Sequence, residues 1–232
     1  MSSTLQIIGL GKQFVLHERG VTIQAFSDVS FEAAPGAFTG LVGASGSGKS
    51  SLLKCIYRTY LPDAGQLVYR SSNGVIDLAS VAPSVILELR RNEIRFVSQF
   101  LTIPPRQSTI DVVAKPLLSL GHQKKPAREM AREMLQRVGL QVDLWNVSPY
   151  TFSGGERQLV NIAMALIVPA KLLLLDEPTA SLDAKSKEKV LQVIEQLKDN
   201  GVTLIGVFHD QTIVERLADV TIHFRGGVQL AS

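Results

Sequence analysis

The sequence predicts an α/β protein with a mostly parallel core sheet, and three features lead to that prediction. Apolar strand-like runs alternate with helical stretches over residues 171–224, and such alternation is typical of parallel sheets. A glycine-rich loop at residues 43–50 stands between a strand-like run and a helical stretch. Helical periodicity dominates the middle of the chain, which indicates a helical insertion into the sheet.

The N-terminal part of the chain is expected to supply an antiparallel β-subdomain. "LQIIGL" at residues 5–10 and "FSDVSFEA" at residues 26–33 are apolar or alternating, and a Pro35-Gly36 turn follows. "AFTGLVG" then reads as a buried strand that ends in the glycine-rich loop. After the loop come a helix that Pro62 would end and two further strands, at residues 50–61, 65–70 and 94–99.

We expect one domain with two interleaved parts. Residues 1–98 and 166–232 are assigned to the core with its β-subdomain, and residues 99–165 to the helical insertion. Within the insertion, a helix begins at Pro126 and stops at Gly139. The C-terminal part is expected to continue with a strand, a helix, a strand, a helix and a short strand, at residues 171–177, 185–199, 202–208, from 210, and 220–224.

Composition excludes several classes of protein. The chain has 232 residues, of which 45% are hydrophobic and 19% charged, as in ordinary globular proteins. A net charge of +3 is too small to indicate binding to nucleic acid, so no such partner is expected. Cys55 is the only cysteine, which excludes an internal disulfide. No secretory signal or membrane span is recognised, and we expect a cytoplasmic protein.

The loop "GASGSGKS", residues 43–50, fits the pattern G-x-x-x-x-G-K-[ST] between a strand and a helix. Small residues let backbone N–H groups wrap a polyphosphate, and Lys49 and Ser50 would serve the β/γ-phosphates and Mg²⁺. A plain glycine turn is the bland alternative, and a dinucleotide fingerprint would need glycine at Ser51. The residues expected to contact nucleotide here are Gly43, Ala44, Ser45, Gly46, Ser47, Gly48, Lys49, Ser50 and Ser51.

Two acids follow a run of four leucines in "LLLLDEP". A buried strand that ends in carboxylates places them at the sheet edge where ligands bind in open α/β sheets. Asp176 is expected to hold Mg²⁺, and Glu177 to polarise a water for attack on the γ-phosphate. The alternative is a pair of acids at a helix start, because Pro178 and Thr179 follow.

A second candidate phosphate site is "FSGGERQ", residues 152–158. Glycine pairs usually mark turns. Ser-Gly-Gly at the start of a helix also leaves backbone N–H groups free for an anion. The chain therefore carries two potential phosphate-binding helix starts.

The order of these motifs resembles the ATP-binding cassette ATPase family over nearly the whole chain. The elements are the phosphate loop, Gln99 at a strand end, "FSGGERQ", "LLLLDEPTASLD" and His209 after an apolar strand. The resemblance implies a P-loop NTPase fold of ABC type that hydrolyses ATP with Mg²⁺. It also implies a head-to-tail dimer, with itself or another cassette ATPase. In that dimer Ser153, Gly154 and Gly155 would meet the ATP held by the partner.

The resemblance assigns further roles by position. Gln99 would sense Mg²⁺ and the attacking water, so Mg²⁺ would be held by Ser50, Gln99 and Asp176. Asp183 would lie at the dimer seam. His209 would contact the γ-phosphate, and Phe14 would stack on adenine; the bland alternatives are a structural histidine and a core phenylalanine. The implied catalytic residues are Glu177, His209, Gln99 and Lys49.

The signature segment departs from the family pattern at four positions. Phe152 stands where leucine is common, and Glu156 where glutamine is common. Leu159 and Met164 occupy positions that usually carry arginine. These changes are expected to weaken the electrostatics of the signature helix.

A narrower resemblance is to the ATPases of the phosphonate carbon–phosphorus lyase system. It rests on stretches such as "FVLHERGV", "YRTYLPDAGQ" and "VSQFLTIPPRQSTIDVV". It implies soluble lyase subunits as partners, docked on an apolar segment that begins at Phe100 and Leu101. The alternatives are a nucleotide-binding subunit of a membrane transporter of lipoprotein-export type, with permease subunits at the inner face of the membrane, and an ATP-gated clamp with weak hydrolysis.

Overall fold

The computed structural model describes residues 3–16, 20–98 and 106–229, in which ten strands form one sheet. The strand order is β5-β4-β1-β2-β10-β9-β3-β8-β7-β6. The strands are β1 (Leu5–Leu16), β2 (Val21–Ala33), β3 (Phe38–Gly43), β4 (Ala64–Ser71), β5 (Gly74–Asp77), β6 (Ile94–Val97), β7 (Leu172–Asp176), β8 (Thr203–Val207), β9 (Val220–Arg225) and β10 (Val228–Gln229). The helices are α1 (Lys49–Ile56), α2 (Pro83–Asn92), α3 (Thr109–Ser119), α4 (Lys124–Val138), α5 (Gly154–Leu166), α6 (Ala184–Asp199) and α7 (Gln211–Leu217).

The mostly parallel core predicted from the sequence is confirmed. Strands β9, β3, β8, β7 and β6 run parallel. Every residue of β7 is buried, because helices and strands cover both faces of this part of the sheet. Leu172 and Leu174 face one apolar cluster, whereas Leu173 and Leu175 face the other. The alternation of side chains along the strand thus joins the two cores.

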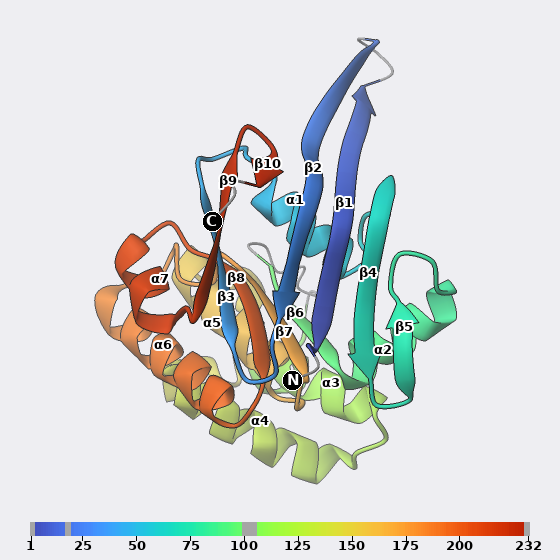
Figure 1. Ribbon diagram of the computed structural model, residues 1–232. Helices are drawn as coiled ribbons and strands as arrows, with labels where there is room; N and C mark the ends of the chain where they lie inside the picture. Colours follow the sequence, from blue (N-terminus) through green and yellow to red (C-terminus); the bar gives the residue numbers. More distant parts are fainter. Residues whose placement is uncertain (1–2, 17–19, 99–105, 230–232) are drawn as a thin grey trace.

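The antiparallel β-subdomain is also present. Strand β1 pairs with β2 and β4, and β4 pairs with β5, all antiparallel. The β1–β2 hairpin extends well beyond the rest of the sheet (Figure 1). Strand β10 joins this part to the core, because it pairs with both β2 and β9. The glycine-rich loop packs against both parts, since Gly48 approaches Ala25 on β2 and Gly43 approaches Phe224 on β9.

Some elements differ from the sequence-based expectation. Helix α1 ends at Ile56 rather than before Pro62, because Arg58 has a left-handed backbone with φ 63° and the N–H groups of Thr59 and Tyr60 both donate to the carbonyl of Lys54. Helix α2, for which we made no prediction, begins with Pro83 in its first turn. Helix α4 stops at Gly139, as expected, with φ 86° at that glycine.

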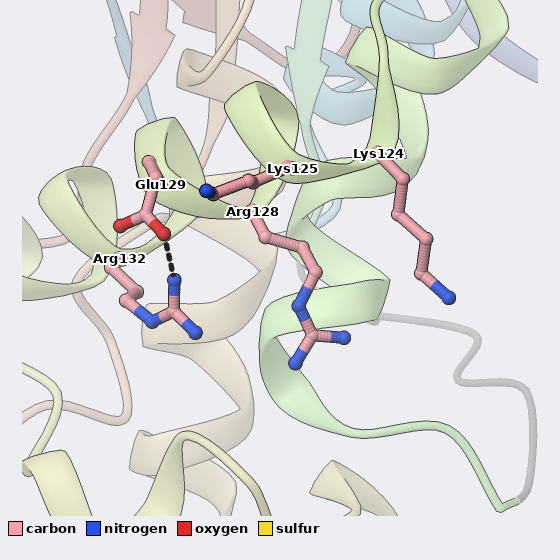
Figure 2. A pocket seen from close by; sticks show the side chains of 5 residues that line it. All are labelled: Lys124, Lys125, Arg128, Glu129 and Arg132. Atoms are coloured by element: carbon pink, nitrogen blue, oxygen red, sulfur yellow. Dashed lines mark hydrogen bonds and ion pairs between the residues drawn. The ribbon is translucent and has the colours of Figure 1, made fainter.

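Helices α3, α4 and α5 follow β6 and precede β7 in the sequence. They pack against one another (Figure 1). Helix α4 buries Ala131, Leu135 and Val138, whereas Met130 is 38% exposed. Its outer face carries the charged side chains drawn in Figure 2, where Arg132 donates to Glu129. The division at residues 98/99 and 165/166 stays a prediction, because α5 contacts β6 as well as α3 and α4.

In the part of the chain that the structure describes, no helix is long and apolar enough to cross a membrane.

Candidate functional site

The glycine-rich loop connects β3 to α1, and two of its glycines are required by close packing. At Gly48, with φ 95°, a Cβ would lie 2.2 Å from the carbonyl oxygen of Ala25. At Gly43 a Cβ would lie 2.4 Å from the carbonyl oxygen of Phe224. Gly48 is also the residue before α1, and among the described residues no side chain caps this helix start. The backbone N–H groups at the start of α1 are therefore available to an anion.

Lys49 lies inside this loop and is 8% exposed. Its Nζ donates to the carbonyl oxygens of Gly43 and Ala44, each at 2.7 Å, and to Ser47 Oγ at 3.2 Å. Burial lowers the pKa of the Lys49 ammonium, whereas Glu177 and Asp176 act in the opposite direction. The loop oxygens thus hold a partly desolvated cation where a phosphate can replace them.

Asp176 ends β7 and is 5% exposed. Ser50 Oγ, from the first turn of α1, donates to Asp176 Oδ1 at 2.7 Å. A hydroxyl and a carboxylate together fit Mg²⁺, which prefers oxygen ligands and takes few of them from the protein when phosphates and water supply the rest. Groups of three or more His, Cys, Asp or Glu side chains with metal-site geometry are absent from the described residues.

Glu177 has an unusual backbone, and its carboxylate contacts His209. Its φ is 52°, in the left-handed region, and its N–H donates to the carbonyl of Val207 at 3.0 Å. Glu177 Oε1 lies 2.8 Å from His209 Nε2. The Glu177 side chain is 16% exposed and the His209 side chain 66%. The ends of β7 and β8 thus hold a carboxylate and an imidazole together, and strained backbone of this kind often marks functional positions.

A cavity of about 260 Å³ adjoins the loop, and Glu177 and Phe14 line it. Phe14 on β1 pairs with Ile23 on β2, which lines the same cavity. The Phe14 ring meets Tyr60 edge-on at 5.1 Å between centroids, and Lys12 Nζ lies 5.3 Å from its centroid. An aromatic side chain therefore lies beside the loop, where the aromatic ring of a nucleobase could stack on it.

The "FSGGERQ" segment starts a separate site. Ser153 is the N-cap of α5, and Asp183 is the N-cap of α6. At Gly155 a Cβ would lie 2.8 Å from the carbonyl oxygen of Ser181. Hydrogen bonds from the backbone and hydroxyl of Ser186 lower the pKa of Asp183. These residues line a second cavity, of about 380 Å³, in which the described lining residues include none from the glycine-rich loop.

Two buried polar residues, neither of which was predicted from the sequence, connect α5 to the ends of core strands. Gln158 Nε2 donates to the carbonyl of Pro178 at 3.2 Å. Asn161 Nδ2 donates to the carbonyl of Ser98 at 2.6 Å. The available signal was two amides three residues apart on the apolar side of a helix, where an unpaired polar group is costly.

The unusual residues of the signature segment have clear packing reasons. Phe152 and Leu159 are 6% and 5% exposed in the apolar cluster to which α3 and α4 also contribute, and Met164 packs against the same cluster. Glu156 completes a capping box with Ser153.

Gln99 and the segment at Phe100 and Leu101 lie outside the described residues, so their predicted roles stay predictions.

Comparison with known proteins settles the family. The model of the ABC transporter family matches residues 26–180. The chain belongs to this family. It is an ABC-type ATPase, in agreement with the fold and ATPase predictions.

Several relatives cover the cassette almost completely. The lipoprotein-releasing system ATP-binding protein LolD of Shewanella sp. (strain MR-7) is 36% identical over 214 residues, which is 92% of this chain and 90% of that protein. The L-cystine import ATP-binding protein TcyC of Bacillus subtilis is 32% identical, over 97% of this chain and 87% of that protein. A dimeric structure of the ATP-binding cassette MJ0796 bound to ADP and Pi is 28% identical, with a TM-score of 0.89 over 98% of this chain and 97% of that one.

These comparisons do not bear out the narrower prediction and favour its alternative. The relatives reported above are ATP-binding proteins of transport systems or a cassette, and they give no support to lyase subunits as partners. The motifs that suggested the lyase ATPases lie in a sequence that is 36% identical to a lipoprotein-releasing protein. The membrane-transporter alternative therefore has the better support.

Proposed function

We propose that the chain is the ATP-hydrolysing subunit of a membrane transporter of lipoprotein-export type, and that it works as a head-to-tail pair of cassettes. The observation that carries the pairing is the separation of the two phosphate-type helix starts. The starts of α1 and α5 line different cavities of the same chain. A second cassette that presents its α5 to this chain's α1 would enclose a polyphosphate from both sides.

Within one cassette, the loop residues would bind the phosphates and Lys49 would exchange its contacts with Gly43 and Ala44 for phosphate oxygens. Ser50, Asp176 and Gln99 would hold Mg²⁺, which supplies neutralising charge at the β/γ-phosphates. Phe14 would stack on the adenine. Each of these contacts positions ATP, and positioning accounts for most of the protein's contribution to phosphoryl transfer.

Glu177 would accept a proton from the attacking water. His209 is placed to orient that carboxylate, because its Nε2 lies 2.8 Å from Oε1. Asp176, one residue earlier, accepts from Ser50, whereas Glu177 contacts His209. Because the two acids have different partners, one can serve the metal and the other the water. Asp183 would contact the second cassette, since it is exposed beside the start of α5.

The pairing can be tested with Glu177→Gln, which keeps the shape of the side chain but removes the base. We expect hydrolysis to fall by about 10²-fold or more, with a dimer on size exclusion in Mg-ATP and a monomer in Mg-ADP. A variant that hydrolyses at the parent rate would show that another group activates the water. A monomer at saturating Mg-ATP would contradict the proposed pairing.

The transporter assignment needs a separate experiment. The tagged chain is purified from detergent-solubilised native cells, and its companions are identified by mass spectrometry. We expect integral membrane permease subunits. Recovery of soluble carbon–phosphorus lyase subunits instead, with loss of growth on a phosphonate when the gene is deleted, would overturn the transporter assignment and support the lyase partners.

A further inference from the structure

The start of helix α5 is closed by one of its own side chains. Glu156 Oε2 accepts the backbone N–H of Ser153 and the Ser153 hydroxyl, each at 2.8 Å. Ser153 Oγ in turn accepts the N–H of Glu156 at 3.3 Å. Both donors of Ser153 are therefore engaged by a carboxylate that is part of the helix's first turn.

The surroundings leave this carboxylate without a strong counter-charge. Glu156 and its neighbour Arg157 are the only charged residues of α5. Among the described residues, no ion pair involves Glu156. Asp183, a further acid, lines the same cavity. The space outside Gly154 is open, since nothing lies within 4 Å of a Cβ placed there. A partner can approach the helix start, but it meets negative charge.

An anion at a helix N-terminus is stabilised by the helix dipole and by free N–H groups. At α5 a resident anion already has part of that stabilisation. A phosphate that docks here must take Ser153 from Glu156 and must bear repulsion from the displaced carboxylate. A terminal phosphate can offset this cost because its oxygens accept hydrogen bonds from several donors at once. A nucleotide without that phosphate cannot.

We propose that Glu156 is a positioning residue that competes with the partner's γ-phosphate for Ser153. This inference rests on the proposed head-to-tail pairing. While the γ-phosphate is present, it holds the Ser153 donors and the dimer stays closed. Once the phosphate leaves, the Glu156 carboxylate takes the donors back, and this favours opening. Glu156 thereby sets the ATP concentration at which the cassettes close.

A purely structural cap makes the opposite prediction. If Glu156 only stabilised α5, removal of its charge would lower thermal stability and would leave dimer closure unchanged or weaker. The competing role requires closure to become easier even though the fold becomes slightly less stable. The two effects have different signs, so they can be told apart in one variant.

The experiment adds Glu156→Gln to the Glu177→Gln protein and titrates Mg-ATP while dimer formation is followed by light scattering. Glutamine keeps an acceptor oxygen for Ser153 but carries no charge. We expect the Mg-ATP concentration for half-maximal dimerisation to fall roughly three- to tenfold, together with a lower Tm. The shift should shrink between low and high salt, because the effect is electrostatic.

Two controls isolate the charge at this position. Asp111→Asn neutralises a matching acid that accepts from the Ser108 hydroxyl at 2.6 Å in the first turn of α3. It should lower Tm, also through loss of the Arg128 ion pair, without changing dimerisation. Glu156→Asp keeps the charge and should remain near the parent midpoint.

The outcomes separate the two proposals. If Glu177→Gln alone stays monomeric in Mg-ATP, the pairing fails and this inference fails with it. If Glu177→Gln dimerises but Glu156→Gln leaves the midpoint unchanged or raises it, only the competing role of Glu156 is overturned. A salt-independent gain, or an equal gain in Glu156→Asp, would also overturn it.

Discussion

Helices α1 and α5 both begin at glycine-rich segments, yet their first turns are opposites. Among the described residues no side chain caps α1, and its first residue is the buried cation Lys49. The start of α5 instead carries a capping box, with Glu156 accepting both donors of Ser153. A helix start that holds a polyphosphate keeps its donors free. A helix start that an anion contacts only part of the time can have its donors bound by a carboxylate of its own first turn.

The two helices also differ in how they are fixed to the core. The start of α1 is fixed by backbone packing, because Gly48 and Gly43 touch neighbouring strands. Helix α5 is fixed farther along by the amides of Gln158 and Asn161. The two loop glycines are thus held against strands, whereas at the start of α5 Gly155 packs against Ser181 and the space outside Gly154 is open.

The largest effect on this comparison is expected from Ser153→Arg. A bulky cation at the start of α5 would block the approach of a second cassette, so turnover should fall to background, about 10²-fold or more below the parent. ATP binding by the monomer should be unchanged, because Ser153 does not line the cavity at α1. Steady-state ATPase assays and calorimetry measure the two quantities; loss of both together would mean that the helix starts are not independent.

Lys49→Ala is the matching change at α1. It removes the buried cation, and we expect ATP affinity to weaken by about 10- to 100-fold, as for loss of a charge-assisted contact. Calorimetric titration with Mg-ATP measures it. Lys125→Ala, an exposed lysine on α4, serves as the control and should bind ATP normally. Unchanged binding in Lys49→Ala would remove this loop from the nucleotide site.

Gly48→Ala should destabilise the fold. Alanine would need the left-handed φ of 95° and would place its Cβ 2.2 Å from the Ala25 carbonyl oxygen. We expect the free energy of unfolding to fall by at least about 1–3 kcal/mol, as measured by urea denaturation. A stability equal to that of the parent would mean that the backbone around Ala25 is able to move away.

Gly154→Ala should show the smallest effect on stability, with the opposite sign. Nothing lies within 4 Å of a Cβ at Gly154, and alanine favours helix over glycine. We expect the free energy of unfolding to rise by about 0.5 kcal/mol while ATP-driven dimerisation weakens, because the methyl group faces the incoming cassette. A gain in both stability and dimerisation would place the contact surface elsewhere on α5.

The sequence was sufficient for the fold class and for the residues around the loop because their spacing reflects local backbone requirements. Gly43, Gly48 and Lys49 are needed wherever a strand turns tightly into a phosphate-binding helix. The contacts of Gln158 and Asn161 were not predicted, since their partners are backbone carbonyls 20 and 63 positions away. Local patterns carry no information on such distant pairings.

Glu156 illustrates a different failure of prediction. The spacing Ser-x-x-Glu is a capping pattern that the sequence could have revealed, yet comparison with the family pattern made it look like a departure only. Similarly, helix α1 ends at Ile56 because Arg58 adopts a left-handed backbone, and an arginine at that position does not predict such a conformation. Arginine seldom adopts that conformation, so tertiary packing decided the helix end.

Glu177 has a consequence for anyone who engineers this protein. Its left-handed φ of 52° costs on the order of 1 kcal/mol for a residue with a side chain, and glycine would adopt the same backbone without that cost. The carboxylate, however, is the proposed base. Glu177→Gly would relieve this strain but would also remove the proposed base, so any heat resistance gained at this position would be expected to come with loss of ATP turnover.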